Sequence, residues 1–241
     1  MLSNLFDEYS LNARVRPSLL ALLPLIIATY ISLPALYNIV ATLLSIIVAC
    51  GFITALAHYS RHRGRKTEER LFSLWGGKPT TIILRHLDDT LDGHTKTRYQ
   101  KYLTEQISGW SAPTIEDEQR SPDTADKLYD SAVRWLLEKT RDTKQYRLLF
   151  IENISYGFRR NARGIKWFGV MCSVIAVLLI IVNIYPNPDY LDSKKYSLEY
   201  SSLIFSIVMF MWWLVVVSDT WVKDAAESYA LRLLAVCENQ K

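Results

Sequence analysis

Cysteine is scarce in this chain, and its three residues, Cys50, Cys172 and Cys237, are too few for a disulfide framework. A small secreted disulfide-rich protein is therefore excluded. Charge is missing from two long stretches: residues 17–57 carry no Asp, Glu, Lys or Arg, and residues 167–217 carry them only between positions 189 and 199. A chain that is 50% hydrophobic and 22% charged, with the two kinds segregated, is neither a wholly soluble enzyme nor a disordered polypeptide.

The uncharged stretches predict four membrane-spanning helices. A helix needs about 20 apolar residues to cross the hydrocarbon core of a bilayer, and such runs occur at residues 17–33, 36–57, 167–185 and 200–217. Pro34 predicts a tight turn between the first two runs, because proline lacks a backbone donor and disfavours helix at the residue before it. The first run is short enough to resemble a signal peptide, but Asp7 and Glu8 are atypical of a basic leader.

Basic residues near the ends of these runs give an expected orientation. They collect on one side of the membrane, at Arg14, Arg16, Arg61, Arg63, Arg65, Lys66, Arg70, Arg159, Arg160, Arg163 and Lys166, whereas the opposite side has only Lys194 and Lys195. By the positive-inside rule both termini and the central segment are cytoplasmic. We therefore expect an all-α membrane protein with four transmembrane helices in two hairpins and a mainly helical cytoplasmic domain. Its expected divisions are residues 1–57 (first hairpin), 58–164 (cytoplasmic domain with a stalk), 165–218 (second hairpin) and 219–241 (C-terminal helix).

The predicted spans contain no ionisable side chain outside the loop at 189–199, which weighs against a proton-coupled transporter or a voltage sensor. Asn38, Thr42 and Ser45 recur at helical spacing on one stripe of the second run. Such a stripe makes contacts between helices of one chain, or it lines a pore when several copies assemble. Four spans are too few to enclose a channel, so the pore interpretation requires a homo-oligomer.

The central segment predicts amphipathic helices. One begins at Pro79, a second near Asp92 or Thr95, and a third covers residues 124–140. Residues 108–123, rich in Ser, Gly, Pro, Glu and Asp, predict a loop or linker. Residues 143–164 predict a stalk helix that leads straight into the third run, and the fourth run is expected to continue into a helix beyond it.

The sharpest local pattern is Gly76-Gly77-Lys78-Pro79-Thr80-Thr81 followed by Arg85. Glycines permit unusual backbone angles, and the start of a helix directs free amides toward an anion. The pattern lacks the spacing of a Walker A loop, since Pro79 follows Lys78 directly. We interpret residues 76–85 as a candidate site for a nucleotide or another anion, with a plain turn between two helices as the alternative.

A second set of side chains could extend this site. Arg98, together with Lys96, Tyr99 and Lys101, would provide a cationic wall with an aromatic face, unless these residues form an ordinary solvated helix surface. We accordingly include Arg98 among the candidate ligand-binding residues.

The remaining chemistry is sparse. Asp88, Asp89, Asp92 and His94 form an acidic cluster that suits helix capping better than a metal or hydrolytic site. Three expectations follow: no catalytic residue, no metal and no cofactor. Nucleic acid is not expected as a partner, because the basic excess lies where membrane lipid already requires it.

Residues 71–99 carry a resemblance. They read Leu-Phe-x-x-Trp-Gly-Gly-Lys-Pro-Thr-Thr, then Leu-Arg-His and Thr-Lys-x-Arg-Tyr, and resemble a family of small bacterial membrane proteins of unassigned function. The predicted layout is similar to that of transmembrane effectors of nucleotide-signalling anti-phage defence systems of the CBASS-like and Hailong-like types. The resemblance implies a location in the bacterial inner membrane and control by a nucleotide made by a partner nucleotidyltransferase.

Together these features lead to one expected function and one principal alternative. The first is an oligomeric inner-membrane effector, a ligand-gated pore that permeabilises the membrane when a nucleotide-like signal binds near residues 76–85. The alternative is a membrane anchor or scaffold whose cytoplasmic domain docks a partner protein. A membrane enzyme that uses Asp88, Asp89 and Asp92 is a weaker third possibility, which predicts metal dependence.

Overall fold

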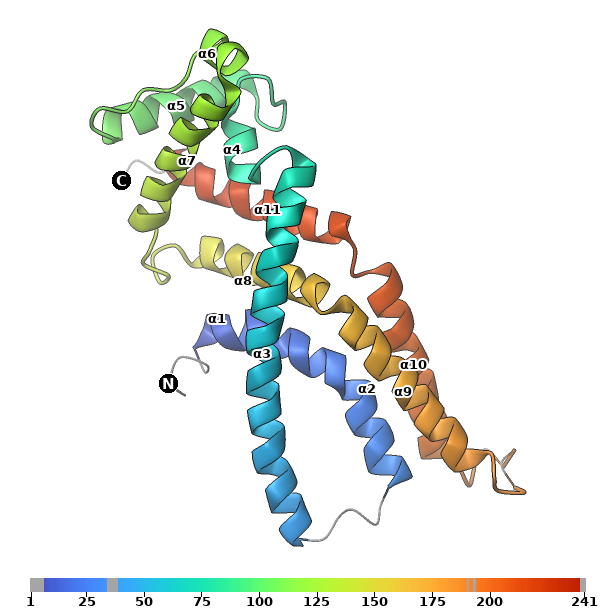
Figure 1. Ribbon diagram of the computed structural model, residues 1–241. Helices are drawn as coiled ribbons and strands as arrows, with labels where there is room; N and C mark the ends of the chain where they lie inside the picture. Colours follow the sequence, from blue (N-terminus) through green and yellow to red (C-terminus); the bar gives the residue numbers. More distant parts are fainter. Residues whose placement is uncertain (1–6, 34–38, 190, 193, 239–241) are drawn as a thin grey trace. The chain divides into compact units, whose positions relative to one another are not determined.

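The structure is a computed structural model that describes residues 7–33, 39–189, 191–192 and 194–238, and within these ranges the side chains of 39–50 are not described. Every regular element in these ranges is a helix (Figure 1). The chain divides into two compact units, each made of two stretches of sequence. Unit 1 comprises Met1–Glu68 and Gly157–Val222, and unit 2 comprises Glu69–Tyr156 and Lys223–Lys241.

Unit 1 contains the apolar helices. Its elements are α1 (Glu8–Ser10), a π-helical turn (Leu11–Val15), α2 (Arg16–Ser32), α9 (Lys166–Ile184), α10 (Ser197–Val215), and parts of α3 (Ile39–Trp75), α8 (Arg147–Gly164) and α11 (Asp219–Leu234). Three helical stretches, Glu8–Ser32, Lys166–Ile184 and Ser197–Val215, are long and apolar enough to cross a membrane. This confirms that three of the four expected runs form helices of sufficient length and hydropathy to span a membrane. The second expected span, residues 36–57, lies partly outside the described residues and stays a prediction, as does the pairing into two hairpins.

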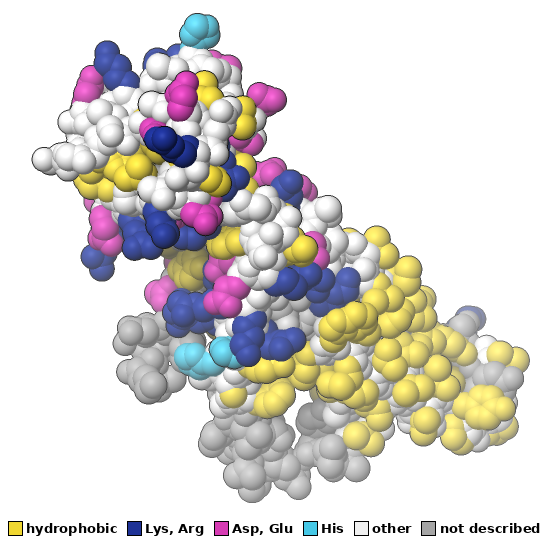
Figure 2. All heavy atoms as spheres, turned by 45° about the horizontal axis from the view of Figure 1, so that its top comes forward, with side chains coloured by type: hydrophobic (Ala, Val, Ile, Leu, Met, Phe, Trp, Pro, Cys, Tyr) yellow, Lys and Arg dark blue, Asp and Glu magenta, His cyan; other side chains and the backbone are white. Residues whose placement is uncertain are grey.

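The apolar helices pack through small residues. Helices α2, α9 and α10 contact one another, and at their contacts Ala21, Ala28, Ala176 and Ser173 are fully buried. Trp213 and Ile180 are buried with them. Most other large apolar side chains on these helices are at least partly exposed, among them Leu23, Ile26, Met171, Leu178, Val182, Ile204, Val208, Met211 and Val215. Figure 2 shows hydrophobic side chains gathered over these helices. Small residues at helix contacts and large apolar residues on the outer surface are typical of helices surrounded by lipid.

The N-terminal helical stretch begins nine residues earlier than the apolar run that predicted it. Asp7 caps its first turn, because its Oδ1 accepts a hydrogen bond from the Ser10 amide at 2.8 Å. Pro24 lies inside α2 without ending it. Proline removes one helical hydrogen bond, and membrane helices tolerate this loss more readily than soluble ones.

Two expected continuous helices are interrupted, which corrects the sequence-based prediction. Ile165 leaves the helical region (φ −110°, ψ 16°), so α8 ends at Gly164 and α9 starts at Lys166. A second break separates α10 from α11 at residues 216–218. Lys166 joins the two breaks, since its Nζ donates to the carbonyl oxygens of Leu214 and Val217 at 2.9 Å each. These carbonyls at the end of α10 attract a cation.

Unit 2 is a small bundle with an aromatic core. Its elements are α4 (Pro79–Leu84), α5 (Gly93–Gln106), α6 (Ile115–Arg120), α7 (Pro122–Lys139), a 3₁₀ turn (Ala235–Glu238), and the remaining parts of α3, α8 and α11. Its core contains Ile83, Leu84, Tyr99, Tyr102, Leu103, Trp110, Tyr129, Leu136, Leu149, Leu233 and Leu234. The predicted starts of α4 at Pro79 and of α5 beside Asp92 are confirmed, and Asp92 caps α5 through the Thr95 amide at 2.9 Å.

The predicted loop at residues 108–123 is wrong in part, because α6 lies within it. Thr114 and Asp117 form a capping box, in which each side chain bonds the backbone of the other. Glu118 of α6 is buried despite its charge. A short polar helix thus forms where composition alone indicates a linker.

Candidate anion-binding site

The turn between α3 and α4 depends on glycine. Gly76 and Gly77 have φ values of +79° and +145°, which side-chain-bearing residues rarely adopt. The Gly77 amide donates to the Phe72 carbonyl at 2.8 Å and so closes the end of α3. Lys78 then has an extended backbone, and α4 begins with Pro79. The sequence pattern therefore marks a sharp turn between helices that presents Lys78 beside it.

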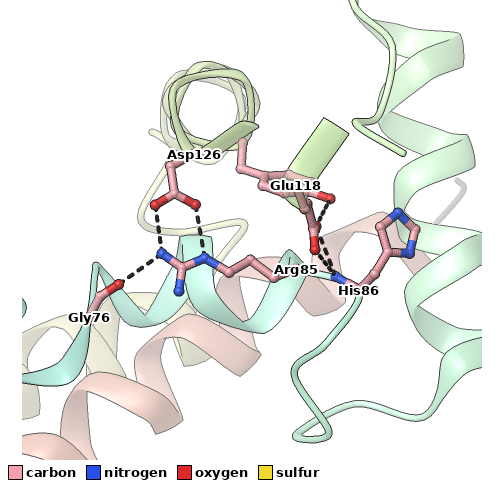
Figure 3. A network of polar contacts seen from close by, with 6 residues as sticks. Gly76, Arg85, His86, Glu118 and Asp126 are labelled. Carbon is pink, nitrogen blue, oxygen red and sulfur yellow. Dashed lines mark hydrogen bonds and ion pairs between the residues drawn. The ribbon is translucent and has the colours of Figure 1, made fainter. Parts of the chain in front are cut away.

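Both cations of the predicted site contact aspartates of α7. Lys78 Nζ lies 2.6 Å from Asp130 Oδ1. Arg85 forms a two-pronged pair with Asp126, with Nε–Oδ1 at 2.9 Å and Nη2–Oδ2 at 2.6 Å, as Figure 3 shows. Arg85 Nη2 also donates to the Gly76 carbonyl at 2.8 Å. Arg85, which directly follows α4, thereby connects the glycine turn, the end of α4 and α7.

These pairs shift the ionisation of their members. The hydrogen bonds that Arg85 donates to Asp126 raise the pKa of the Arg85 guanidinium. Partial burial opposes this shift, and the negative charge of Asp126 adds to it. Burial raises the pKa of Asp130, but the hydrogen bonds and charges of Lys78 and Arg134 outweigh it, so the pKa of Asp130 is lowered. Arg134 Nη2 lies 3.1 Å from Asp130 Oδ2, so a third cation stands beside the two pairs.

A buried carboxylate lies next to this site. Glu118 accepts the Tyr129 hydroxyl hydrogen bond at 2.7 Å, and both of its oxygens accept from the His86 amide at 2.9 and 3.1 Å (Figure 3). His86 Nε2 lies 2.9 Å from the Pro113 carbonyl oxygen. Burial, followed by the bond to Glu118, raises the pKa of Tyr129. These contacts fix α6 and α7 against the residue that follows Arg85.

The other predicted ligand residues have separate positions. Thr80 and Thr81 are buried in α4 rather than presented to solvent. Arg98 pairs with Glu238 of the C-terminal turn, with Nη2–Oε1 at 2.6 Å. Lys96 is buried and donates to the carbonyls of Arg85 (2.6 Å) and Asp88. Of the expected wall, Lys96 and Tyr99 are buried and Arg98 is paired, whereas Lys101 is exposed. The structure brings together Gly76, Gly77, Lys78 and Arg85.

Two further predictions concern other parts of the chain. The side chains of the proposed pore residues Asn38, Thr42 and Ser45 lie outside the described residues. Among the residues that are described, no three His, Cys, Asp or Glu side chains are grouped as metal ligands. Asp88 and Asp92 instead accept backbone amides of Thr90 and Thr95 at 3.0 and 2.9 Å, as capping residues do.

Sequence reasoning missed the acidic half of the site. Asp126 and Asp130 lie four residues apart on α7, so they share one helix face. That face contacts Lys78 and Arg85. This spacing is visible in the sequence, but the partner helix is not. Chemically, two cations held by exchangeable carboxylates can bind an anion that replaces those carboxylates.

The comparisons with known protein families, with curated proteins and with solved structures found no match to this chain.

Proposed function

We propose that this protein is an oligomeric membrane effector that an anionic, nucleotide-like ligand controls. The ligand binds at Gly76, Gly77, Lys78 and Arg85, and the apolar helices of several copies form a pore that permeabilises the bacterial inner membrane. The setting is anti-phage defence, with the signal made by a partner nucleotidyltransferase. The observation that carries the proposal is the pairing of Lys78 and Arg85 with two aspartates of one helix beside a glycine turn.

Exchange of these ion pairs explains how a ligand acts. Partly exposed ion pairs contribute about 0–1 kcal/mol each to stability, and the Lys78 side chain is 47% exposed. A ligand with two negative groups can therefore replace Asp126 and Asp130 at small cost. Release of these aspartates frees α7 from the glycine turn, which gives the bound and unbound protein different contacts.

The apolar helices support the membrane part of the proposal. They expose large apolar side chains, and one copy contributes too few helices to surround a channel. Assembly of several copies provides enough helices to surround a channel. To change a mostly closed population into a mostly open one, the ligand must favour the open state by about 5.5 kcal/mol, summed over its sites.

Release of a trapped dye from liposomes tests the proposal. The purified protein is reconstituted with a trapped fluorescent dye, and a panel of linear and cyclic mono- and dinucleotides is added. We expect one of them to release the dye from wild-type liposomes, and we expect the Lys78→Gln/Arg85→Gln variant to lose the response while it still assembles. Arg141→Gln/Lys144→Gln, which removes two exposed cations of the same unit outside the candidate site, is the matched control.

The opposite change tests the exchange itself. Asp126→Asn/Asp130→Asn removes the competing carboxylates and leaves both cations in place, so the ligand concentration for half-maximal release should fall about tenfold. Equal responses of wild type and both double variants would refute the site.

One observation favours the alternative of a partner-docking anchor. In unit 2 a cavity of about 210 Å³ lies between the start of α8 and the end of α11. Leu148, Leu149 and Val236 provide apolar walls, and Arg147 and Arg232 provide basic ones. This cavity suits one apolar side chain of an acidic partner segment. Co-purification of a stoichiometric partner, lost in Leu148→Asp, together with no dye release, would favour the anchor.

A further inference from the structure

Three chain segments of unit 1 cross at close range. The Asn161 side chain of α8 donates to the Ala13 carbonyl at 2.7 Å, and Ser60 of α3 donates to the Asn161 carbonyl at 3.3 Å. Glycines allow the approach, since a Cβ on Gly164 would lie 2.5 Å from the Gly64 nitrogen. The segment before α2 and the middle of α3 are therefore held against the same part of α8.

This crossing gathers arginines that lack matching acids. Arg61 and Arg65 lie four residues apart on α3, and in the described part of the chain neither forms an ion pair or a hydrogen bond. Arg14 has only weak partners, a hydrogen bond to Ser10 Oγ at 2.9 Å and the Tyr9 ring with its centroid 5.3 Å away.

The neighbouring acids are engaged elsewhere. Glu68 pairs with Arg160 at 2.8 Å. Asp7 caps α1 by accepting from Ser10, and its charge compensates that of Arg14 in part without forming an ion pair among the described residues. Partial burial lowers the pKa of Arg61, and the positive charges of Arg14, Arg65 and Arg160 lower it further. The three unmatched arginines are thus close enough to repel one another, and repulsion of this kind is relieved by a bound anion.

The cluster borders the apolar part of the unit. Arg14 comes two residues before the start of α2. On α3, the half-exposed Phe52 and Tyr59 precede Arg61 by nine and two residues. In Figure 2, Lys and Arg side chains gather beside the hydrophobic surface. Aromatic and basic residues in this order are typical of the level of the lipid head groups.

We propose that Arg14, Arg61 and Arg65 form a binding site for the phosphate of an anionic phospholipid head group. The guanidinium groups bind the phosphate oxygens, and the acyl chains lie along the exposed apolar side chains of α2 and α3. This site is separate from Gly76–Arg85 and does not depend on the proposed function. The chemistry that recognises the ligand is that of a phosphate diester, and the adjacent apolar surface selects a lipid over a soluble phosphate.

Native mass spectrometry of the full chain in detergent tests the site. Phosphatidylglycerol and phosphatidylcholine with the same acyl chains are added in equal amounts, and bound lipids are counted from the mass shifts. We expect wild type to prefer phosphatidylglycerol by about tenfold, because each basic residue at the surface favours anionic lipid severalfold. Arg14→Gln/Arg61→Gln/Arg65→Gln should lose this preference.

Two controls make the result decisive. Lys127→Gln/Arg141→Gln/Lys144→Gln removes three exposed charges from unit 2 and should keep the preference. Because Arg61 forms no hydrogen bond among the described residues, Arg61→Gln alone preserves the fold and should still reduce the preference severalfold, whereas Arg61→Lys should retain it. An equal preference in the site variant and the control would overturn the proposal. Competition by millimolar glycerol phosphate or inorganic phosphate would overturn the assignment to a lipid.

Discussion

The two units differ in what they bury and what they expose. Unit 1 buries many Ala, Ser and Gly residues at its helix contacts, together with a few large side chains such as Trp213 and Ile180, and it exposes many Leu, Ile and Val side chains. Unit 2 buries large side chains such as Tyr129, Leu103 and Trp110, and exposes charge. In water only the second arrangement gains from the hydrophobic effect. The first is stable where the surroundings are as apolar as the side chains, and close approach of backbones replaces apolar burial as the source of stability.

If close approach stabilises unit 1, a single added side chain should have the largest effect. In Gly164→Val the new Cβ meets the backbone of residues 63 and 64, which cannot move as a flexible side chain does. We expect a loss of roughly 3–4 kcal/mol in unfolding free energy, from overpacking at a helix crossing. Thermal unfolding in detergent, followed by circular dichroism, measures it.

The control for this prediction is Gly51→Ala in α3, where an added Cβ meets nothing within 4 Å. It should leave the melting temperature unchanged or raise it slightly, since alanine favours helix. Equal stability of Gly164→Val and wild type would show that the crossing is not a close contact.

In unit 2, the loss of a buried hydrogen bond should lower the free energy of unfolding. Tyr129→Phe removes the donor to Glu118 and leaves that buried carboxylate with the His86 amide. We expect a loss of about 2 kcal/mol. A pH dependence accompanies it: the pKa of Tyr129 is raised, so its contribution is complete below pH 10, where unfolded tyrosine is also protonated.

Above pH 10 the unfolded chain ionises at this position while the folded one does not, and the contribution falls by up to about 1.4 kcal/mol per pH unit. Chemical denaturation of wild type and Tyr129→Phe between pH 8 and 11 measures the difference. A constant gap between the two proteins across this range would contradict the assignment.

Ion pairs of the two units should contribute differently to stability, because they differ in burial. The Arg160–Glu68 pair of unit 1 is mostly buried, with side chains 13% and 20% exposed, whereas the Arg98–Glu238 pair of unit 2 is largely exposed. Arg160→Gln should cost about 1–2 kcal/mol, because the mostly buried Glu68 loses its ion pair with Arg160. Arg98→Gln should not change the melting temperature measurably. A reversed order would refute the comparison.

The alkylation rates of buried cysteines should show the smallest of these effects. Cys237 is buried in unit 2, and burial raises its pKa to about 12, so at pH 8 its thiolate is almost absent. In the Cys50→Ser/Cys172→Ser variant, alkylation should be at least about a hundredfold slower than for an exposed cysteine. A single-cysteine variant that retains Cys172 of unit 1 should become reactive at a different denaturant concentration. Simultaneous exposure of both thiols would show that the units unfold together.

The sequence was sufficient for elements that local chemistry defines. Uncharged runs predicted α9 and α10, and Pro79 and Asp92 predicted the starts of α4 and α5. It was insufficient where tertiary contacts decide. The break at Ile165 accompanies the Gly64–Gly164 approach and the bonds of Lys166, which have no local signal. Helix α6 did have one, the capping pair Thr114 and Asp117, but the polar composition of residues 108–123 favoured a loop, and the burial of Glu118 is a tertiary contact.

The candidate site divides in the same way. Its glycine turn and its cations, Lys78 and Arg85, follow from adjacent residues in the sequence. Their partners Asp126 and Asp130 are 41 and 52 positions away, and a single sequence does not indicate such pairs. The partners of Arg98 and Lys96 are likewise distant in sequence or set by tertiary contacts: Arg98 pairs with Glu238 of the C-terminal turn, and Lys96 donates to the carbonyls of Arg85 and Asp88 just after α4.

The core of unit 2 includes Ala230, Leu233, Leu234 and Val236, which come from the last stretch of the chain. During synthesis the ribosome produces residues 69–156 first, then every residue of α9 and α10, and only afterwards this closing piece. The aromatic core therefore stays incomplete until residues 230–236 have been synthesised, and a chain interrupted before them carries its apolar helices without a complete unit 2. Quality-control proteases that recognise exposed apolar surface can thus distinguish such interrupted chains from chains that contain residues 230–236.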